Sequence, residues 1–374
     1  MAAVSLAHGA GDDLSDLSAE PPADTVVLQR AESADSPQGL AARWRALQRD
    51  PGDADAASRY AGLALRQYAV SGDARHLGYA ERALADWQDA ADPPLSVWLL
   101  RGRILQTQHR FAEAGADLDR LLAKHRHSVE GMLMAADAWR RAGEIDRARS
   151  RCAGLALAGF AEPASHCAAD ILMSLGKAAE AYALLSPLHT GPSRAPKELK
   201  QWMLTVAADA AAAAGRNPQA RAFYERALAI PDAGIAVHAS YADLLLAEGR
   251  PHDAIAALGR ARNQDADALL LRRAIAAKQL DGADFGALRD RLRAAFDEAE
   301  ALGTATLHLR ELALFALWID DDPHAALAHA RLNWTLQKGW EDAALFIDAA
   351  RAAGRPEAAG AVHDWRRRFQ AGGG

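Results

Sequence analysis

The sequence has few cysteines, few aromatic residues and no excess of basic charge. Of its 374 residues only 2 are cysteine and 6% are aromatic, and the formal net charge is -6. Because no C-x-x-C motif occurs, the cysteines lack the spacing of a structural zinc site. The absence of a basic block argues against nucleic-acid binding, and no apolar run approaches the ~18 residues that a membrane span needs.

Sequence motifs of catalysis and of cofactor binding are also missing. The chain contains no H-E-x-x-H, G-x-S-x-G or G-x-x-x-x-G-K-[ST] motif. His125 and His127 are two residues apart, which is a poor helical spacing for a shared metal ligand. We therefore expect no cofactor, no metal centre and no enzymatic activity.

Alanine and other helix-favouring residues dominate what is present. Long stretches of Ala, Leu, Arg and Glu favour helix, whereas the Val and Ile runs typical of strands are nearly absent. Helical periodicity begins near Gln38 and continues to Phe369. Residues 1–36 are instead rich in Asp, Ser, Pro, Gly and Ala, which predicts a disordered tail before an all-α domain at 37–374.

One short frame recurs along the helical part: an Asp, a Gly six residues later, and an Ala five residues after the Gly. Its copies are Asp137–Gly143–Ala148, Asp170–Gly176–Ala181, Asp209–Gly215–Ala220, Asp243–Gly249–Ala254 and Asp348–Gly354–Ala359. The first four copies lie roughly 34 residues apart, the length of a helix-turn-helix repeat, and the last follows after about three such periods. We expect the Gly to end one helix in the left-handed conformation and the small Ala to let the next helix pack closely.

These repeated columns resemble the tetratricopeptide repeat (TPR) family. The segment "ARAFYERALAIP" (220–231) matches the second helix of that repeat, and "WLLRGRILQTQHRFAEAGADL" (98–118) matches the first helix and turn. The resemblance covers about residues 60–369 and implies a right-handed α-solenoid of roughly seven to nine TPR-like hairpins, with degenerate capping repeats at both ends. Within the family, the sequence is similar to a subgroup of bacterial, often exported proteins.

The Asp column has two interpretations. In the TPR pattern it lies on the first helix of each pair, facing a concave groove, so the resemblance implies a row made of Asp137, Asp170, Asp209, Asp243 and Asp348. Many TPR proteins carry a peptide-contacting Asn in this column, and its replacement by Asp favours a basic or amine-bearing partner. Alternatively, each Asp forms a salt bridge within the solenoid. The arginines available for this are Arg101, Arg103, Arg140, Arg141, Arg272 and Arg273.

Trp202 also has two interpretations, because it lies in an apolar segment at helical spacing. It either packs between hairpins or leans toward the groove as an apolar anchor for a partner.

Cys152 and Cys167 are centred on the connection between two expected helices, one ending near Leu157 and the next starting near Glu162. Residues equidistant from such a turn lie level on antiparallel helices, so the two sulfur atoms could meet. A reducing cytosol would leave them as buried thiols, and an oxidising compartment would join them. The segment 5–7 resembles the end of a signal peptide, so the protein is either cytoplasmic or, if truncated or processed, exported.

Taken together, the sequence predicts a non-enzymatic scaffold that binds a segment of a protein or peptide partner in an acidic concave groove. An alternative of another class is an exported accessory protein that binds a small cation or metal through Asp and His. Carboxylates spread at repeat spacing do not converge on one ion, which argues against that alternative.

Overall fold

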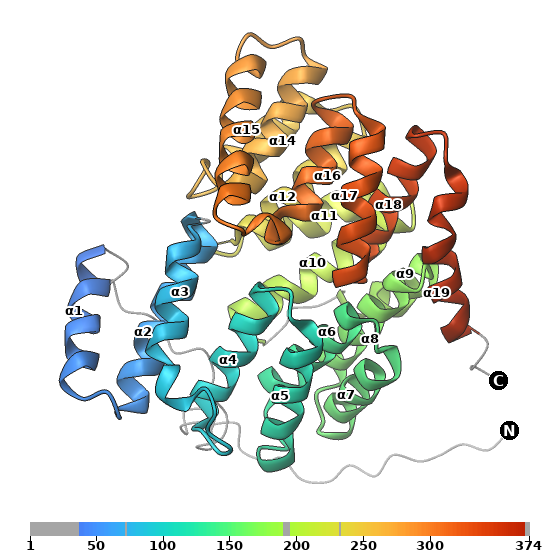
Figure 1. Ribbon diagram of the computed structural model, residues 1–374. Coiled ribbons are helices and arrows are strands. Elements are labelled where there is room, and N and C mark those ends of the chain that lie inside the picture. Colours follow the sequence, from blue (N-terminus) through green and yellow to red (C-terminus); the bar gives the residue numbers. More distant parts are fainter. Residues whose placement is uncertain (1–36, 72, 190–194, 232, 371–374) are drawn as a thin grey trace, which may run out of the picture.

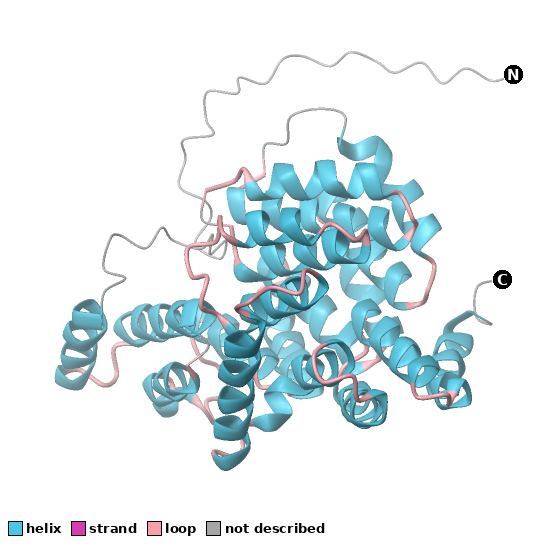
Figure 2. Cartoon of the chain, turned by 90° about the horizontal axis from the view of Figure 1, so that it is seen from above, coloured by secondary structure: helices cyan, strands magenta, loops and turns pink. Residues whose placement is uncertain are grey.

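The computed structural model describes residues 37–71, 73–189, 195–231 and 233–370. Within these ranges every regular element is a helix, as Figures 1 and 2 show. The all-α prediction is therefore confirmed for the described part of the chain. The predicted disordered tail, residues 1–36, lies outside it.

In the described part of the chain, one leading helix, α1 (Pro37–Arg49), precedes nine consecutive helix hairpins, α2–α3 to α18–α19. The first helices of the hairpins are α2 (Ala54–Ser71), α4 (Leu95–Thr107), α6 (Val129–Ala142), α8 (Ala161–Ser174), α10 (Lys197–Ala213), α12 (Ile235–Ala247), α14 (Asp267–Gln279), α16 (Leu309–Trp318) and α18 (Trp340–Ala352). The second helices are α3 (Ala74–Ala83), α5 (Phe111–Lys124), α7 (Ile145–Leu157), α9 (Ala178–Leu185), α11 (Asn217–Leu228), α13 (Pro251–Leu258), α15 (Phe285–Ala301), α17 (Pro323–Leu336) and α19 (Gly360–Gln370).

The hairpins stack in series and form a TPR-like α-solenoid (Figure 1). Each first helix contacts the first helix of the next hairpin, from α2 through to α18, which makes one continuous row of helices. Most second helices pack against their own partner and against the following first helix, as α5 does between α4 and α6. Each hairpin thereby buries apolar surface that its predecessor leaves uncovered.

The glycines of the repeated frame act as the sequence predicts. Gly143, Gly176, Gly215, Gly249 and Gly354 all have positive φ, between 67° and 88°. At Gly143 the amide donates to Arg140 O at 3.0 Å, and the next amide, Glu144 N–H, donates to Trp139 O at 2.8 Å. This pair of bonds is the Schellman arrangement that ends a helix. The alanines five residues later are 0–3% exposed, which confirms their close packing.

Hairpins without the frame glycine keep the same turn with another residue. His109, Asp281 and Asp321 have φ values of 59°, 50° and 54°. At His109 and Asp281 the paired hydrogen bonds persist, with Arg110 N–H donating to Leu105 O at 2.9 Å and Gly282 N–H to Ala277 O at 2.8 Å. Asp and His tolerate this conformation better than most residues. The drifted units between Gly249 and Gly354 are therefore complete hairpins with Asp in place of Gly.

The C-terminal hairpins contact helices α6 and α8 from the middle of the sequence. In the α17–α18 connection, the Lys338 amide donates to Arg141 O at 2.9 Å, and Arg366 Nε of α19 donates to Ser174 O at 3.1 Å. Trp365 is 3% exposed, and a Cβ atom at Gly143 would lie 3.1 Å from its Nε1. The cationic side chain of Arg366 thus lies at the C-terminal end of α8, where the helix dipole favours positive charge. The solenoid closes on itself at these contacts.

Candidate functional site

The five predicted aspartates all lie on first helices, but their surroundings differ. Asp137 is on α6, Asp170 on α8, Asp209 on α10, Asp243 on α12 and Asp348 on α18. Four of them contact arginine side chains, and the fifth, Asp209, accepts a hydrogen bond from a tyrosine. The structure therefore places this column among polar partners from the protein itself.

Arg140 on α6 joins the first two members of the column. It is 4% exposed, and its Nη2 donates to Asp137 Oδ1 at 2.6 Å while its Nε lies 3.1 Å from Asp170 Oδ2. Its Nη1 also donates to the buried Ser174 hydroxyl at 3.1 Å. Burial alone would lower the pKa of Arg140, but the two carboxylates outweigh burial and raise it. One guanidinium thus links successive hairpins.

Asp137 and Asp170 respond differently to this shared guanidinium. Burial favours the neutral form of Asp137, but Arg141 and Arg140 together hold its pKa below the usual range. Arg141 Nε lies 3.0 Å from the Asp137 Oδ1 atom. Burial raises the pKa of Asp170 to about 6 although Arg140 opposes the shift, and the charges of Asp137 and Glu341 add to it. The pKa of Asp170 therefore lies about two units above its ordinary value of 3.8.

Asp209 and Asp243 differ in burial and partner. Asp209 is 8% exposed and accepts a hydrogen bond from the Tyr224 hydroxyl on the neighbouring α11. Burial, followed by the charge of Glu341, raises the pKa of Asp209 well above its ordinary value, so its neutral form is favoured. Asp243 instead receives two hydrogen bonds from Arg272 of α14, Nε to Oδ1 at 2.9 Å and Nη2 to Oδ2 at 2.8 Å.

Asp348 stands apart from the other four. Its side chain is 55% exposed, and its ion pair is with Arg351 on the same helix, at 3.8 Å. On α18 the buried carboxylate is Asp342, which is 1% exposed. Arg310 Nε, Asn333 Nδ2 and Gln337 Nε2 donate to Asp342 Oδ1 at 2.8, 2.7 and 3.1 Å.

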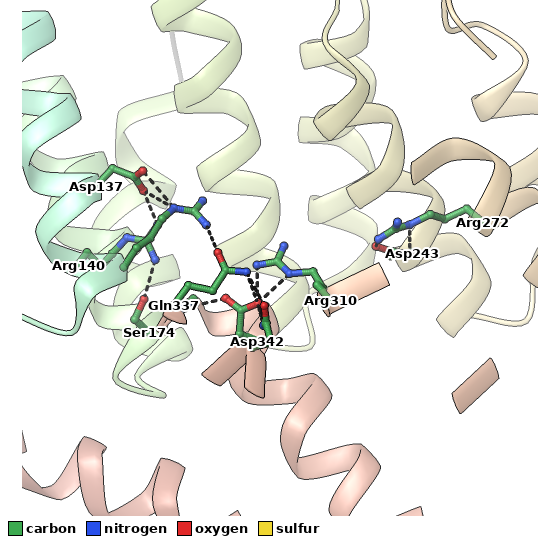
Figure 3. A network of polar contacts seen from close by, with 11 residues as sticks. Asp137, Arg140, Ser174, Asp243, Arg272, Arg310, Gln337 and Asp342 are labelled. Carbon is green, nitrogen blue, oxygen red and sulfur yellow. Dashed lines mark hydrogen bonds and ion pairs between the residues drawn. The ribbon is translucent and has the colours of Figure 1, made fainter. Parts of the chain in front are cut away.

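Figure 3 shows that polar contacts connect the aspartate–arginine group on α6 with the group around Asp342 on α18. Arg141 donates to Gln337 Oε1 at 3.4 Å, so the network runs from Asp137 on α6 to Asp342 on α18. Burial would raise the pKa of Asp342, but Arg310 and Arg141 hold it below its usual range. Sequence reasoning named Arg140, Arg141 and Arg272 as available partners but missed Arg310, Gln337 and Asp342, because these follow no repeat column.

A pocket with a volume of about 400 Å³ opens on the first helices α6, α8 and α10, and Arg103 and Gln106 of α4 also line it. Asp137, Asp170 and Trp202 line it together with Leu133 and Leu199. The Trp202 ring is half-buried and its centroid lies 6.0 Å from that of His166 on α8. Asp209, Asp243 and Asp348 are not among the residues that line this pocket. The predicted site residues are thus partly brought together.

The charges around the pocket are unevenly balanced. Its carboxylates are Glu130, Asp137, Asp170 and Glu198, and its arginines are Arg103 and Arg140. Both arginines already hold pocket carboxylates, since Arg103 Nη2 lies 2.9 Å from Glu130 Oε1 and Arg140 contacts the two aspartates. Burial also raises the pKa of Glu130, although Arg103 favours the ionised form. Carboxylates therefore outnumber arginines among the lining residues, while Arg141 also contacts Asp137 and Lys197 Nζ lies 3.7 Å from Glu198 Oε1.

Cys152 of α7 and Cys167 of α8 form a disulfide in this structure, with their Cα atoms 5.6 Å apart. The helix boundaries at Leu157 and Ala161 match the expected turn closely. Cys167 also lines the pocket, on the same helix as Asp170. The disulfide thus fixes the helix that carries one wall of the pocket.

In the part of the chain that the structure describes, no group of three or more His, Cys, Asp or Glu side chains is arranged to hold a metal ion. No described helix is long and apolar enough to cross a membrane. The first finding gives no support to the alternative of metal binding by converging Asp and His.

Several solved structures are similar to this chain at low sequence identity. No family model and no curated protein matches the sequence. The type IV pilus biogenesis factor PilW is similar at 18% identity over 56% of this chain and 97% of its own, with a TM-score of 0.43. A tetratricopeptide repeat protein from Parabacteroides merdae is similar at 14% identity over 73% and 98%, with a TM-score of 0.40. A human IFIT1 dimer with PPP-AAAA is similar at 12% identity over 89% and 87%, with a TM-score of 0.46.

Proposed function

We propose that this protein is a non-enzymatic interaction scaffold that holds a segment of a partner protein in the pocket on α6, α8 and α10. The observation that carries the proposal is the pocket itself, which brings Asp137, Asp170 and Trp202 to one cavity of about 400 Å³. This volume lies within the ~300–1,000 Å³ range of ligand sites in proteins. Ion pairs and a disulfide hold its walls, so a partner meets a largely preformed surface.

The proposed binding surface includes Asp137 and Asp170 but not the other three aspartates of the column. Asp209 is buried against Tyr224, Asp243 is held by Arg272, and Asp348 lies apart on α18. The acidic lining of the pocket supports a basic partner segment, because negative potential at a surface attracts and orients cationic groups. Asp243 joins two hairpins through Arg272, whereas Asp209 pairs within one hairpin and Asp348 within one helix.

Site-specific photo-crosslinking in the cells that make the protein tests this proposal. One variant carries a photo-crosslinking amino acid at Leu199, which lines the pocket, and a matched variant carries it at the exposed Ile255 on α13. We expect a discrete protein adduct from position 199, with mass spectrometry locating the crosslink in one short partner segment. Adducts from position 255 alone, or the same adducts from both positions, would contradict a pocket-bound partner.

The Cys152–Cys167 disulfide supports a location in an oxidising compartment. Both cysteines of the sequence take part in it, and disulfides persist in oxidising compartments such as the periplasm. We propose that the scaffold works in an exported form. Alkylation of free thiols in intact cells, followed by mass spectrometry, should find Cys152 and Cys167 unmodified until a reductant is added. Alkylation of both cysteines without reductant would place the protein in a reducing compartment.

A further inference from the structure

We infer that the pocket on α6, α8 and α10 accepts one long cationic side chain, an arginine or a lysine, from the partner segment. This inference rests on the proposed function and specifies the chemistry of its ligand. It follows from three features of the pocket: its charge balance, its apolar walls and the position of Trp202.

The charge balance favours a cation. Four carboxylates and two arginines line the cavity, and each arginine is already engaged by at least one of those carboxylates. Asp170 shares Arg140 with Asp137, which Arg141 also contacts, so the ion pair of Asp170 is with a guanidinium already bound to another carboxylate. A ligand cation placed near Asp170 would give this largely buried carboxylate a counter-charge that it does not share. An acidic segment would meet carboxylates on three helices, since Glu130, Asp170 and Glu198 lie on α6, α8 and α10.

The walls favour a long apolar stem behind that cation. Leu133 and Met134 of α6, Ile171 of α8 and Leu199 of α10 line the same cavity as the carboxylates. Lysine and arginine bury their methylene groups against such surfaces while the charged end stays among polar groups. A purely apolar side chain would instead remove Asp170 and Glu130 from water without supplying a counter-charge.

Trp202 adds a feature that suits cations in particular. It lines the cavity from α10, facing α8, where its ring lies near His166. The face of an indole ring attracts guanidinium and ammonium groups more strongly than phenylalanine or tyrosine rings do. Aromatic, aliphatic and acidic groups therefore surround one cavity, each matching a different part of an arginine or lysine side chain.

The experiment begins with peptides selected from a random heptapeptide display library on the full chain, immobilised in its oxidised form. We expect enrichment of sequences that share an arginine or lysine. The best peptide is then synthesised with that residue as arginine, lysine, citrulline, norleucine or glutamate, and binding is measured by fluorescence polarisation. Citrulline and norleucine should weaken binding at least about tenfold, which corresponds to about 1.4 kcal/mol, whereas lysine should stay within about tenfold of arginine.

Protein variants then test whether the selected peptide binds in the pocket. Glu198→Gln and Trp202→Ala remove groups that line the cavity, and Glu180→Gln removes an exposed carboxylate of α9 as the matched control. We expect weaker binding of the cationic peptide to the first two variants and unchanged binding to the third. Thermal denaturation of each variant separates a lost contact from a lost fold.

Two outcomes would overturn the inference. One is a selected consensus that is acidic or lacks a cation, including a library that yields no binder. The other is equal affinity for the arginine and citrulline peptides. If Leu199 crosslinks a partner while citrulline binds as well as arginine, the scaffold function stands and the cationic ligand is wrong. If neither crosslinks nor peptides appear, both proposals fail.

Discussion

The Arg140 guanidinium on α6 lies 3.1 Å from the Asp170 carboxylate on α8, so an ion pair joins two successive hairpins at the wall of the pocket. Both side chains are largely removed from water, with 5% and 18% of their surfaces exposed. A charge in such a position is stable only while its partner is present. The pair therefore connects the stability of the repeat stack to the charge of the proposed binding site.

Replacing Arg140 by methionine should strongly destabilise the protein. The substitution leaves Asp170 without its ion-pair partner, and removing one member of a buried pair costs about 3–5 kcal/mol. Urea unfolding followed by circular dichroism measures the change. Arg351→Met is the matched control, because Arg351 is 71% exposed and pairs with Asp348 at 3.8 Å, so its loss should cost less than about 1 kcal/mol. Similar losses for both variants would show that Arg140 makes no special contribution.

Asp170 should make stability depend on pH. Its folded-state pKa of about 6 lies above its ordinary value of 3.8, so the folded state binds the extra proton between these pH values. The stabilising contribution is present below pH 3.8 and is lost as pH rises through about 6, because burying the ionised carboxylate is unfavourable. One pKa unit corresponds to about 1.4 kcal/mol, so the loss is at most about 3 kcal/mol.

The Asp170→Asn variant tests this dependence, with free energies of unfolding measured between pH 4 and pH 8. The difference between wild type and variant should change across pH 6, and a constant difference would contradict the assignment. The groups that act on Asp170 are Arg140, Asp137 and Arg141 on α6 and Glu341 on α18. Binding of a cationic peptide should strengthen over the same rise in pH, since Asp170 gains its negative charge.

Removing the disulfide should lower stability without changing the fold. Cys152 and Cys167 are separated by 15 residues, and closing a loop of that length stabilises a protein by about 3 kcal/mol in the chain-entropy account. The Cys152→Ala/Cys167→Ala variant should therefore unfold at lower urea concentration. A reductant should shift wild type toward the variant and leave the variant unchanged. If wild type unfolds identically with and without reductant, the cysteines do not stabilise the protein through a bond.

Close packing of α5 against α6 depends on a glycine. A Cβ atom at Gly115 would lie 2.5 Å from Cε2 of the Trp139 ring, which is 3% exposed. Gly115→Ala should therefore cost about 1–3 kcal/mol through overpacking. Gly78 in α3 has no atom within 4 Å of its Cβ position, so Gly78→Ala should stabilise by about 0.5–1 kcal/mol. Thermal melting of the two variants should move in opposite directions, and a common direction would refute the packing argument.

Local features of the fold were predictable because they depend on residues close in sequence. The glycine six residues after each Asp takes positive φ, and the alanine five residues later is buried, as at Gly143 and Ala148. The same frame failed to locate turns at His109, Asp281 and Asp321, where the conformation is kept by residues other than glycine. Tolerance of positive φ by His and Asp is a weaker sequence signal than glycine.

The candidate site was predictable only in part. The repeat pattern placed Asp137 and Asp170 on first helices, and Trp202 near them, which agrees with the lining of the pocket. It did not reveal that Asp209 pairs with Tyr224 in a buried position, since side-chain depth depends on the packing of neighbouring hairpins. Nor did it show that Asp342, rather than Asp348, is the buried carboxylate of α18.

The sequence by itself determined that the chain forms stacked helix hairpins, because helix propensity, left-handed turns and small residues at helix contacts act over a few residues or one repeat. Only the tertiary structure decided that the chain between α17 and α18 returns to α6, where Lys338 N–H bonds Arg141 O and Gln337 accepts from Arg141. That return results from small rotations added over many hairpins, and no single segment of the sequence records their sum. The same rotations decide which carboxylates share an arginine and which of them line the pocket.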